Sequence, residues 1–169
     1  MKIKKIYLFI SVILALILSG CATIKLVGDY DEQTDRGITV LQKDMETFFI
    51  KLEDFDGEMA APYHKNNYFY GKAKVAISSL RIRADAMERN SITVRMLDRL
   101  QNNFNEFAID HKEGIHKKEL PLYLGGFNSQ FTAILTFELA KKRGEKPDSE
   151  KAMIAATPNT LTSNTGVKK

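Results

Sequence analysis

Residues 32–53 read EQTDRGITVLQKDMETFFIKLE, and this stretch indicates how the chain folds. Its apolar residues recur at steps of three and four, which places them on one face of an α-helix. Acidic residues gather at its start, where they offset the positive end of the helix dipole, and Asp31 is the expected N-cap. The pattern predicts an amphipathic helix from Glu32 to Glu53, weakened in its first turns by Gly37 and followed by the breakers Gly57 and Pro62. Its apolar face consists of Ile38, Leu41, Met45, Phe48, Phe49 and Leu52.

A second apolar stripe runs from Asn67 to Arg89. Three alanines on this stripe suggest that a neighbouring helix approaches closely there. Two further apolar residues, Val75 and Ile82, lie off the main stripe, so the buried face of this helix is expected to be wide. The alanines are Ala73, Ala76 and Ala84.

Two more helices are predicted downstream. The turn at 90–93 offers Ser91 or Thr93 as a cap that accepts a backbone N–H bond, and the helix after it ends near Lys112, with Gly114 as a left-handed terminator. The last helix begins near Leu120, tolerates Pro121 in its first turn and ends at Gly144.

These four stripes with short connections predict an all-α fold, an antiparallel four-helix bundle over residues 31–144. The sequence contains no repeat and no convincing strand pattern. Residues 145–169 lose the apolar periodicity and are rich in Thr, Asn and Ser, which predicts a mostly disordered tail with a helical turn around Glu150 to Ala156.

The N-terminus has the features of a targeting segment. Three lysines within residues 1–5 precede an apolar run from Ile6 to Leu18, which is shorter than the roughly 20 residues that a helix needs to span a bilayer. Ser19, Gly20 and Cys21 follow this run directly. Residues 1–20 are therefore predicted to be a signal peptide that is removed, and residues 21–30 a tether.

The sequence Leu18-Ser19-Gly20-Cys21 resembles the lipobox of bacterial lipoproteins, which has an aliphatic residue, two small residues and a cysteine. The resemblance implies that processing enzymes recognise Leu18, Ser19 and Gly20 and cleave before Cys21. The Cys21 sulfur would receive a diacylglyceryl group, and its new amino group an acyl chain. Two or three acyl chains anchor a protein firmly, whereas one holds it only marginally. The alternative is an ordinary signal peptide cut elsewhere.

The expected partners are therefore the lipid bilayer, reached through the acyl chains on Cys21, and the lipoprotein-processing enzymes. Ala22 follows the cysteine, where an aspartate tends to retain lipoproteins at the inner membrane of two-membrane bacteria. Ala22 favours a location in the outer membrane, facing the periplasm. A lone free thiol would be a liability in an oxidising compartment, and a thioether removes it.

Composition limits the remaining possibilities. Removal of the signal peptide leaves 149 residues, enough for one domain with a single core. The net charge of +4 includes the three lysines of residues 1–5, so the mature chain is near +1 and gives no reason to expect nucleic acid binding. With a single cysteine no internal disulfide is possible. No cofactor is expected.

No catalytic or metal-binding motif stands out. His64, His111 and His116 match no zinc spacing, even with Asp110 or Glu113 as a further ligand, and are expected to be solvated. Glu138 is expected at the boundary of the last helix, paired with a lysine or arginine; the Glu-x-x-His pairs of di-metal bundles do not occur. The acidic loop of Asp54, Asp56 and Glu58 lacks a complete calcium-loop pattern.

Two other features are assigned structural roles. Gly125-Gly126 follows no strand, which argues against a phosphate-binding loop and favours close packing or a kink. An aromatic group near residue 68 could contact a partner or lipid headgroups, but is expected to cover one end of the bundle. This group consists of Tyr63, Tyr68, Phe69 and Tyr70.

Several runs beyond the lipobox resemble a group of small, uncharacterised bacterial lipoproteins. They are the stretches at 30–37, 41–43, 90–94, 127–135 and 138–142. The resemblance covers most of residues 21–143 and implies a location, but it carries no activity and no functional residues.

Three functions remain open. The first is a non-enzymatic envelope lipoprotein that binds or scaffolds an unknown envelope protein. The second is a ligand-binding or enzymatic bundle whose buried polar site includes Glu138, Arg81 or His111. The third is an accessory lipoprotein of the toxin or immunity type.

Overall fold

The computed structural model describes residues 27–144, and in this range the chain forms four α-helices and no strand. The all-α prediction is confirmed. The helices are α2 (Glu32–Glu53), α3 (Asn67–Asp85), α4 (Ser91–Glu113) and α5 (Leu120–Lys142), and two short 3-10 helices, η1 (Tyr63–Asn66) and η2 (Lys117–Glu119), precede α3 and α5.

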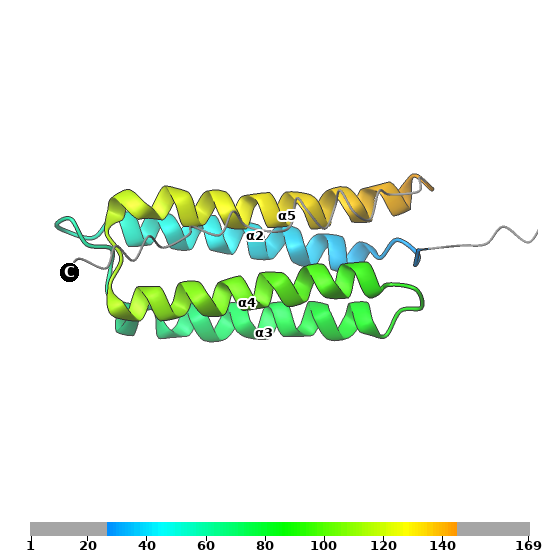
Figure 1. Ribbon diagram of the computed structural model, residues 1–169, viewed down its shortest axis with the longest axis horizontal. Coiled ribbons are helices and arrows are strands. Elements are labelled where there is room, and N and C mark those ends of the chain that lie inside the picture. Colours follow the sequence, from blue (N-terminus) through cyan, green and yellow to red (C-terminus); the bar gives the residue numbers. More distant parts are fainter. Residues whose placement is uncertain (1–26, 145–169) are drawn as a thin grey trace, which may run out of the picture.

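The four helices lie side by side along one long axis, and each runs in the opposite direction to the one before it (Figure 1). Helix α2 packs against α3 and α5, and α4 packs against the same two helices. Helices α3 and α5 therefore lie diagonally across from one another. The beginning of α2, the end of α3, the beginning of α4 and the end of α5 meet at one end of the structure.

Helix α2 has the bounds that the sequence predicts. Asp31 adopts an extended backbone, and its side chain accepts a hydrogen bond from the backbone N–H of Thr34, so it is the N-cap as expected. Gly37 was expected to weaken this helix. In the structure it allows α2 and α3 to approach one another closely. A Cβ atom at this position would lie 2.6 Å from Cδ2 of Leu80 on α3.

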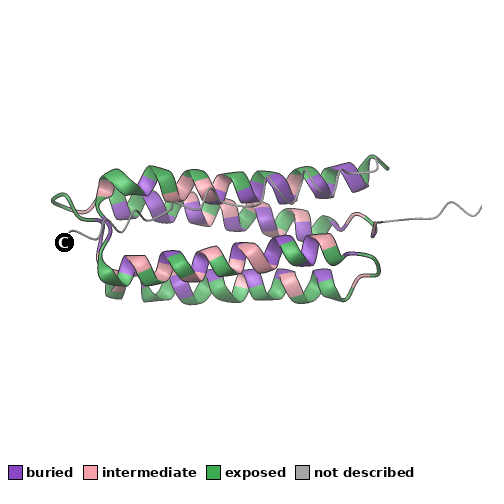
Figure 2. Ribbon diagram, in the orientation of Figure 1, coloured by how far each residue is buried: buried purple, intermediate pink, exposed green. Residues whose placement is uncertain are grey.

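The core lies between the four helices, and each of them carries buried residues (Figure 2). All six residues of the predicted α2 stripe are buried. Aromatic rings fill one half of the interior. Phe48 stacks on Phe69 with 3.7 Å between ring centroids, and Phe49 stacks on Phe107 at 5.1 Å.

Several helix details differ from the expectations. Helix α3 ends at Asp85 rather than near Arg89, because the Asn90 side chain donates to the Ala84 carbonyl and Arg89 takes a positive φ of 59°. The expected wide buried face of α3 is wrong, since Val75 and Ile82 are exposed.

The terminator and cap of α4 also differ. Gly114 has a positive φ of 110°, but its ψ of 129° places it outside the left-handed helical region. Asn90 occupies the N-cap position in place of Ser91 or Thr93.

The two connections at the far end are bonded to each other. The backbone N–H of Ala60 donates to Ile115, and that of Lys117 donates to Glu58, with distances of 2.9 Å in both cases. Met59 and His116 form an isolated antiparallel bridge between these bonds. The α2–α3 and α4–α5 connections are thus held together, which closes that end of the structure.

The predicted signal peptide, Cys21 and the predicted C-terminal tail lie outside the described residues. No helix within 27–144 has both the length and the apolar character that crossing a membrane requires.

Candidate functional site

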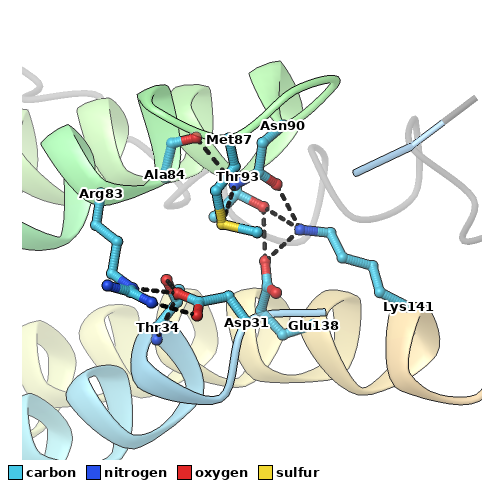
Figure 3. Close-up of polar contacts among 9 residues, drawn as sticks. All are labelled: Asp31, Thr34, Arg83, Ala84, Met87, Asn90, Thr93, Glu138 and Lys141. Carbon is cyan, nitrogen blue, oxygen red and sulfur yellow. Dashed lines mark hydrogen bonds and ion pairs between the residues drawn. The ribbon is translucent and has the colours of Figure 1, made fainter. Parts of the chain in front are cut away.

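Four polar side chains are buried together where α4 begins and α5 ends (Figure 3). Nζ of Lys141 donates to Oε1 of Glu138 at 2.6 Å, to Oδ1 of Asn90 at 2.5 Å and to Oγ1 of Thr93 at 2.9 Å. The Thr93 hydroxyl in turn donates to Oε1 of Glu138 at 2.7 Å. We call these four residues the buried polar cluster.

The cluster joins three helices. Thr93 lies in the first turn of α4, and Glu138 and Lys141 lie three residues apart in the last turns of α5. Asn90 precedes α4, and its Nδ2 donates to the carbonyl of Ala84 near the end of α3, at 3.1 Å. The cluster therefore connects helix ends that are far apart in the sequence.

The charges of the cluster are removed from water. The side chains of Glu138 and Lys141 are each 1% exposed. The ammonium group uses all three of its donors, but Oε2 of Glu138 has no hydrogen-bond partner among the described residues. Removing one member of such a buried ion pair typically costs about 3–5 kcal/mol, because the other charge is left uncompensated.

A second ion pair holds the beginning of α2 to the end of α3 (Figure 3). The Arg83 guanidinium donates twice to the Asp31 carboxylate, from Nε to Oδ2 at 2.5 Å and from Nη2 to Oδ1 at 2.7 Å. Thr34 adds a hydroxyl bond of 2.6 Å to Oδ2. These bonds hold the pKa of Asp31 well below its usual range, and the hydrogen bonds from Arg83 make the largest contribution.

The chain enters the four helices beside this ion pair. The backbone N–H of Gly28 donates to the carbonyl of Arg89 in the α3–α4 connection, at 2.9 Å. A Cβ atom on Gly28 would lie 2.7 Å from the carbonyl oxygen of Glu88, so only glycine fits without a shift. Val27 packs against the core. The first described residues are therefore held against the α3–α4 connection and the core.

A separate polar group is buried at the opposite end. The Tyr70 hydroxyl lies 2.5 Å from Nδ1 of His111, and Nε2 of His111 lies 2.6 Å from the carbonyl oxygen of Ala61. A carbonyl can only accept, so Nε2 carries the proton and Nδ1 accepts from tyrosine. Burial lowers the pKa of His111 and raises that of Tyr70.

Comparison with known proteins identifies no family for this chain. No family model, no curated protein and no solved structure matches the chain.

Two expectations about individual candidates were wrong. Glu138 is fully buried rather than at the boundary, although its predicted lysine partner exists as Lys141. His111 is buried in the last turn of α4 and is not a solvated loop histidine, because Tyr70 and Ala61 satisfy both of its ring nitrogens.

The three residues suggested for a shared polar site do not meet. Thr93 and His111 are 18 positions apart in α4, about 27 Å at 1.5 Å per residue, so Glu138, which bonds Thr93, and His111 lie at opposite ends. Arg81 is partly exposed and paired with Asp98 at 2.8 Å and Asp85 at 3.3 Å.

The solvent exposure expected of two histidines and of the acidic loop is confirmed. His64 and His116 are exposed, as are the loop carboxylates of Asp54, Asp56 and Glu58. Among the described residues no group of three or more histidine, cysteine, aspartate or glutamate side chains could hold a metal ion.

The aromatic group is divided between core and solvent. Tyr70 is buried, and Tyr63 stacks on it with 4.4 Å between centroids, so these rings cover one end of the interior as expected. Tyr68 is instead 85% exposed. The expectation of close packing at Gly125-Gly126 is wrong, because a Cβ atom at either position would meet nothing within 4 Å.

The buried polar cluster and the Asp31–Arg83 ion pair were not found by sequence reasoning. Their partners are 45 to 52 residues apart, so no local spacing links them. The one local signal was the three-residue step from Glu138 to Lys141, which puts both side chains on one helix face.

Proposed function

We propose that this protein is a non-enzymatic lipoprotein of the bacterial cell envelope, held at a membrane by acyl chains on Cys21. Its helices would form an antiparallel four-helix bundle that faces the periplasm from the outer membrane and binds or scaffolds another envelope component. The observation that carries the proposal is Leu18-Ser19-Gly20-Cys21 directly after a short apolar run and a basic N-terminus.

Two features of the described residues support an anchored bundle. Alternating helix directions and the mutual packing of neighbours are the features of an up-down-up-down bundle (Figure 1). The Gly28–Arg89 bond and the Asp31–Arg83 ion pair fasten the chain where it leads toward Cys21. A firmly held junction of this kind suits a domain that is tethered at its N-terminus.

The enzymatic alternative receives less support from the described geometry. The three polar residues considered for it are separated, and the buried polar cluster is occupied by its own ion pair and hydrogen bonds. No contact among the described residues favours the toxin or immunity-type alternative.

Metabolic labelling with an alkyne fatty acid tests the anchor. We expect the wild-type chain to be labelled and its mature N-terminus to be a modified Cys21 in mass spectrometry. Cys21→Ser should abolish the label, because serine has no sulfur to accept the diacylglyceryl group. Ser19→Ala is the matched control, since it keeps a small residue before the cleavage site and should remain labelled.

An unmodified Cys21 at the mature N-terminus, or a mature chain that begins elsewhere, would contradict the proposal. Separation of inner and outer membranes on a density gradient then tests the location, with the wild-type chain expected in the outer-membrane fraction.

A further inference from the structure

We propose that the outward surface of α3 lies on the anionic lipid surface to which Cys21 tethers the chain. The inference rests on the proposed function, because it needs an anchored protein, and it deepens that function by assigning a lipid contact to the folded region itself. We call this surface the α3 face. It consists of Tyr68, Gly71, Lys74, Val75, Ser78, Ser79 and Ile82.

Large apolar side chains line up along this face. Tyr68, Val75 and Ile82 are 85%, 70% and 63% exposed, and each is seven residues from the next. Seven residues make nearly two helix turns, so the three side chains lie in one row along α3. The core-facing residues of α3, such as Ile77 and Ala84, are on the other side. The core therefore does not account for this second apolar row.

The face is hollowed and continues onto α4. One shallow, open hollow of about 560 Å³ is lined by Gly71, Ser78 and Ser79 together with Lys74, Val75 and Ile82. A second, of about 480 Å³, lies between α3 and α4 over Tyr70 and Phe104. Gly71 and Lys74 line both, so the two hollows form one surface. Such a surface can receive headgroups and upper acyl segments between its side chains.

The charge of this surface is positive. Neither hollow is lined by an acidic residue, and within α3 the only acidic residue is Asp85, at its last position. Lys74 and Lys112 line the second hollow, and within the described residues no ion pair to a carboxylate involves either ammonium group. An anionic lipid surface complements this charge. A second copy of the same face would place lysine against lysine, which disfavours a dimer.

The tether places this face near the bilayer. Gly28 is bonded to Arg89, so the chain toward Cys21 starts beside the end of α3. The seven residues 21–27 reach at most about 25 Å when fully extended. The end of α3 therefore stays within that distance of the membrane. With α3 resting on the surface, its lysine stems can lie along the apolar layer while their ammonium groups meet the phosphates.

Spin labelling of the lipidated full chain tests the inference. Cys21 is the only cysteine, and in the proposed mature protein its sulfur is blocked as a thioether, so Val75→Cys provides a single labelling site. Leu122→Cys is the matched control, because Leu122 is 53% exposed on α5, diagonally across from α3. Each protein is placed in vesicles of phosphatidylglycerol with phosphatidylethanolamine, or of phosphatidylcholine alone. Oxygen, which concentrates in lipid, and a neutral nickel chelate, which stays in water, report the environment of the label.

In the anionic vesicles we expect the label at 75 to be accessible to oxygen and shielded from the nickel chelate. The label at 122 should be accessible to the nickel chelate and less accessible to oxygen. In phosphatidylcholine both labels should be aqueous. Lys74→Gln with Lys112→Gln should weaken docking of the face roughly 30-fold, since each lysine near an anionic leaflet contributes roughly fivefold. Lys43→Gln with Lys118→Gln removes the same charge elsewhere on the exposed surface and should leave docking unchanged.

Flotation of the vesicles separates the two proposals. A chain that does not float with lipid overturns the anchor and this inference with it. A chain that floats but keeps the label at 75 as aqueous as that at 122 overturns the α3 face alone. A label at 75 that is shielded equally in both kinds of vesicle indicates a protein contact, such as a second copy, and also overturns the lipid contact.

Discussion

The ammonium group of Lys141 is buried, and its three donors are all used by side chains of the buried polar cluster. Lys141→Met should lower the free energy of unfolding by about 3–5 kcal/mol, because Glu138 then keeps a buried charge without its cation. The double variant Glu138→Leu, Lys141→Met removes both charges and should recover most of that loss. Urea denaturation followed by circular dichroism measures both changes.

Lys142→Met is the control for this pair. Lys142 is exposed, and its Nζ lies 5.0 Å from the centroid of the Tyr30 ring. Such a contact contributes about 0.5–1 kcal/mol at an exposed site, so Lys142→Met should lower the free energy of unfolding by no more than that. A double variant that is as unstable as Lys141→Met would show that the charges themselves are not the source of the loss.

The imidazole of His111 should make stability depend on pH. Burial lowers its pKa in the folded state below the ordinary value of 6.5. At a pH well above 6.5 the imidazole is neutral in both states, and its contribution to stability is complete. As the pH falls below 6.5 the unfolded chain takes up a proton before the folded chain does, so stability decreases, by at most about 1.4 kcal/mol per pH unit. Denaturation at a series of pH values from 8 to 5 measures the slope.

His111→Gln retains a side-chain amide donor and should flatten the slope between pH 6.5 and 5, whatever its effect on absolute stability. The control is His64→Gln, whose exposed side chain lies in η1, and it should keep the wild-type slope. An unchanged slope in His111→Gln would assign the pH dependence to other groups.

For single residues, the sequence predicted those roles that depend on partners close by in the chain. Asp31 was identified as an N-cap because its partner is the N–H three residues later. Thr93 was interpreted as a possible cap, because its true side-chain partners, Glu138 and Lys141, lie on another helix. Burial of a charge depends on the packing of several helices and leaves no mark on local spacing.

Two glycines within helices should respond differently to replacement by alanine. At Gly125 in α5 a Cβ atom would meet nothing within 4 Å, so Gly125→Ala should raise the free energy of unfolding by about 0.5–1 kcal/mol through the lower entropy of the unfolded chain. At Gly37 in α2 the same methyl group would lie 2.6 Å from Cδ2 of Leu80. Gly37→Ala should therefore give no gain, because α3 must move or Leu80 must repack. Thermal unfolding of both variants makes the comparison.

A gain in stability from Gly37→Ala equal to that from Gly125→Ala would contradict the close approach of α2 and α3.

The helices themselves were largely predictable, because their apolar periodicity is strong and their caps are local. The bounds of α2 agree with the prediction at both ends. The end of α3 was predicted four residues too late, since the bond from Asn90 to Ala84 that terminates it comes from the next element. The row of Tyr68, Val75 and Ile82 was assigned in part to the core, because periodicity alone cannot distinguish two apolar sides of one helix.

In the whole molecule, both ends of the four-helix region are closed by contacts between segments distant in sequence. At one end the buried polar cluster and the Asp31–Arg83 pair connect all four helices (Figure 3). At the other, backbone bonds join the two connections, and His111 reaches both Tyr70 and Ala61. The sequence predicted the number and order of the helices but none of these closures. They arise only once the helices are side by side.

The fastening of Gly28 to Arg89 has a mechanical consequence. If the chain is anchored through Cys21 as proposed, a pull from that side would first load the packing of Val27 and the Gly28–Arg89 bond, and then the ion pair between Asp31 and Arg83. Because both oxygens of that carboxylate are held by one guanidinium, the junction would resist a pull until two bonds break together, and then release abruptly.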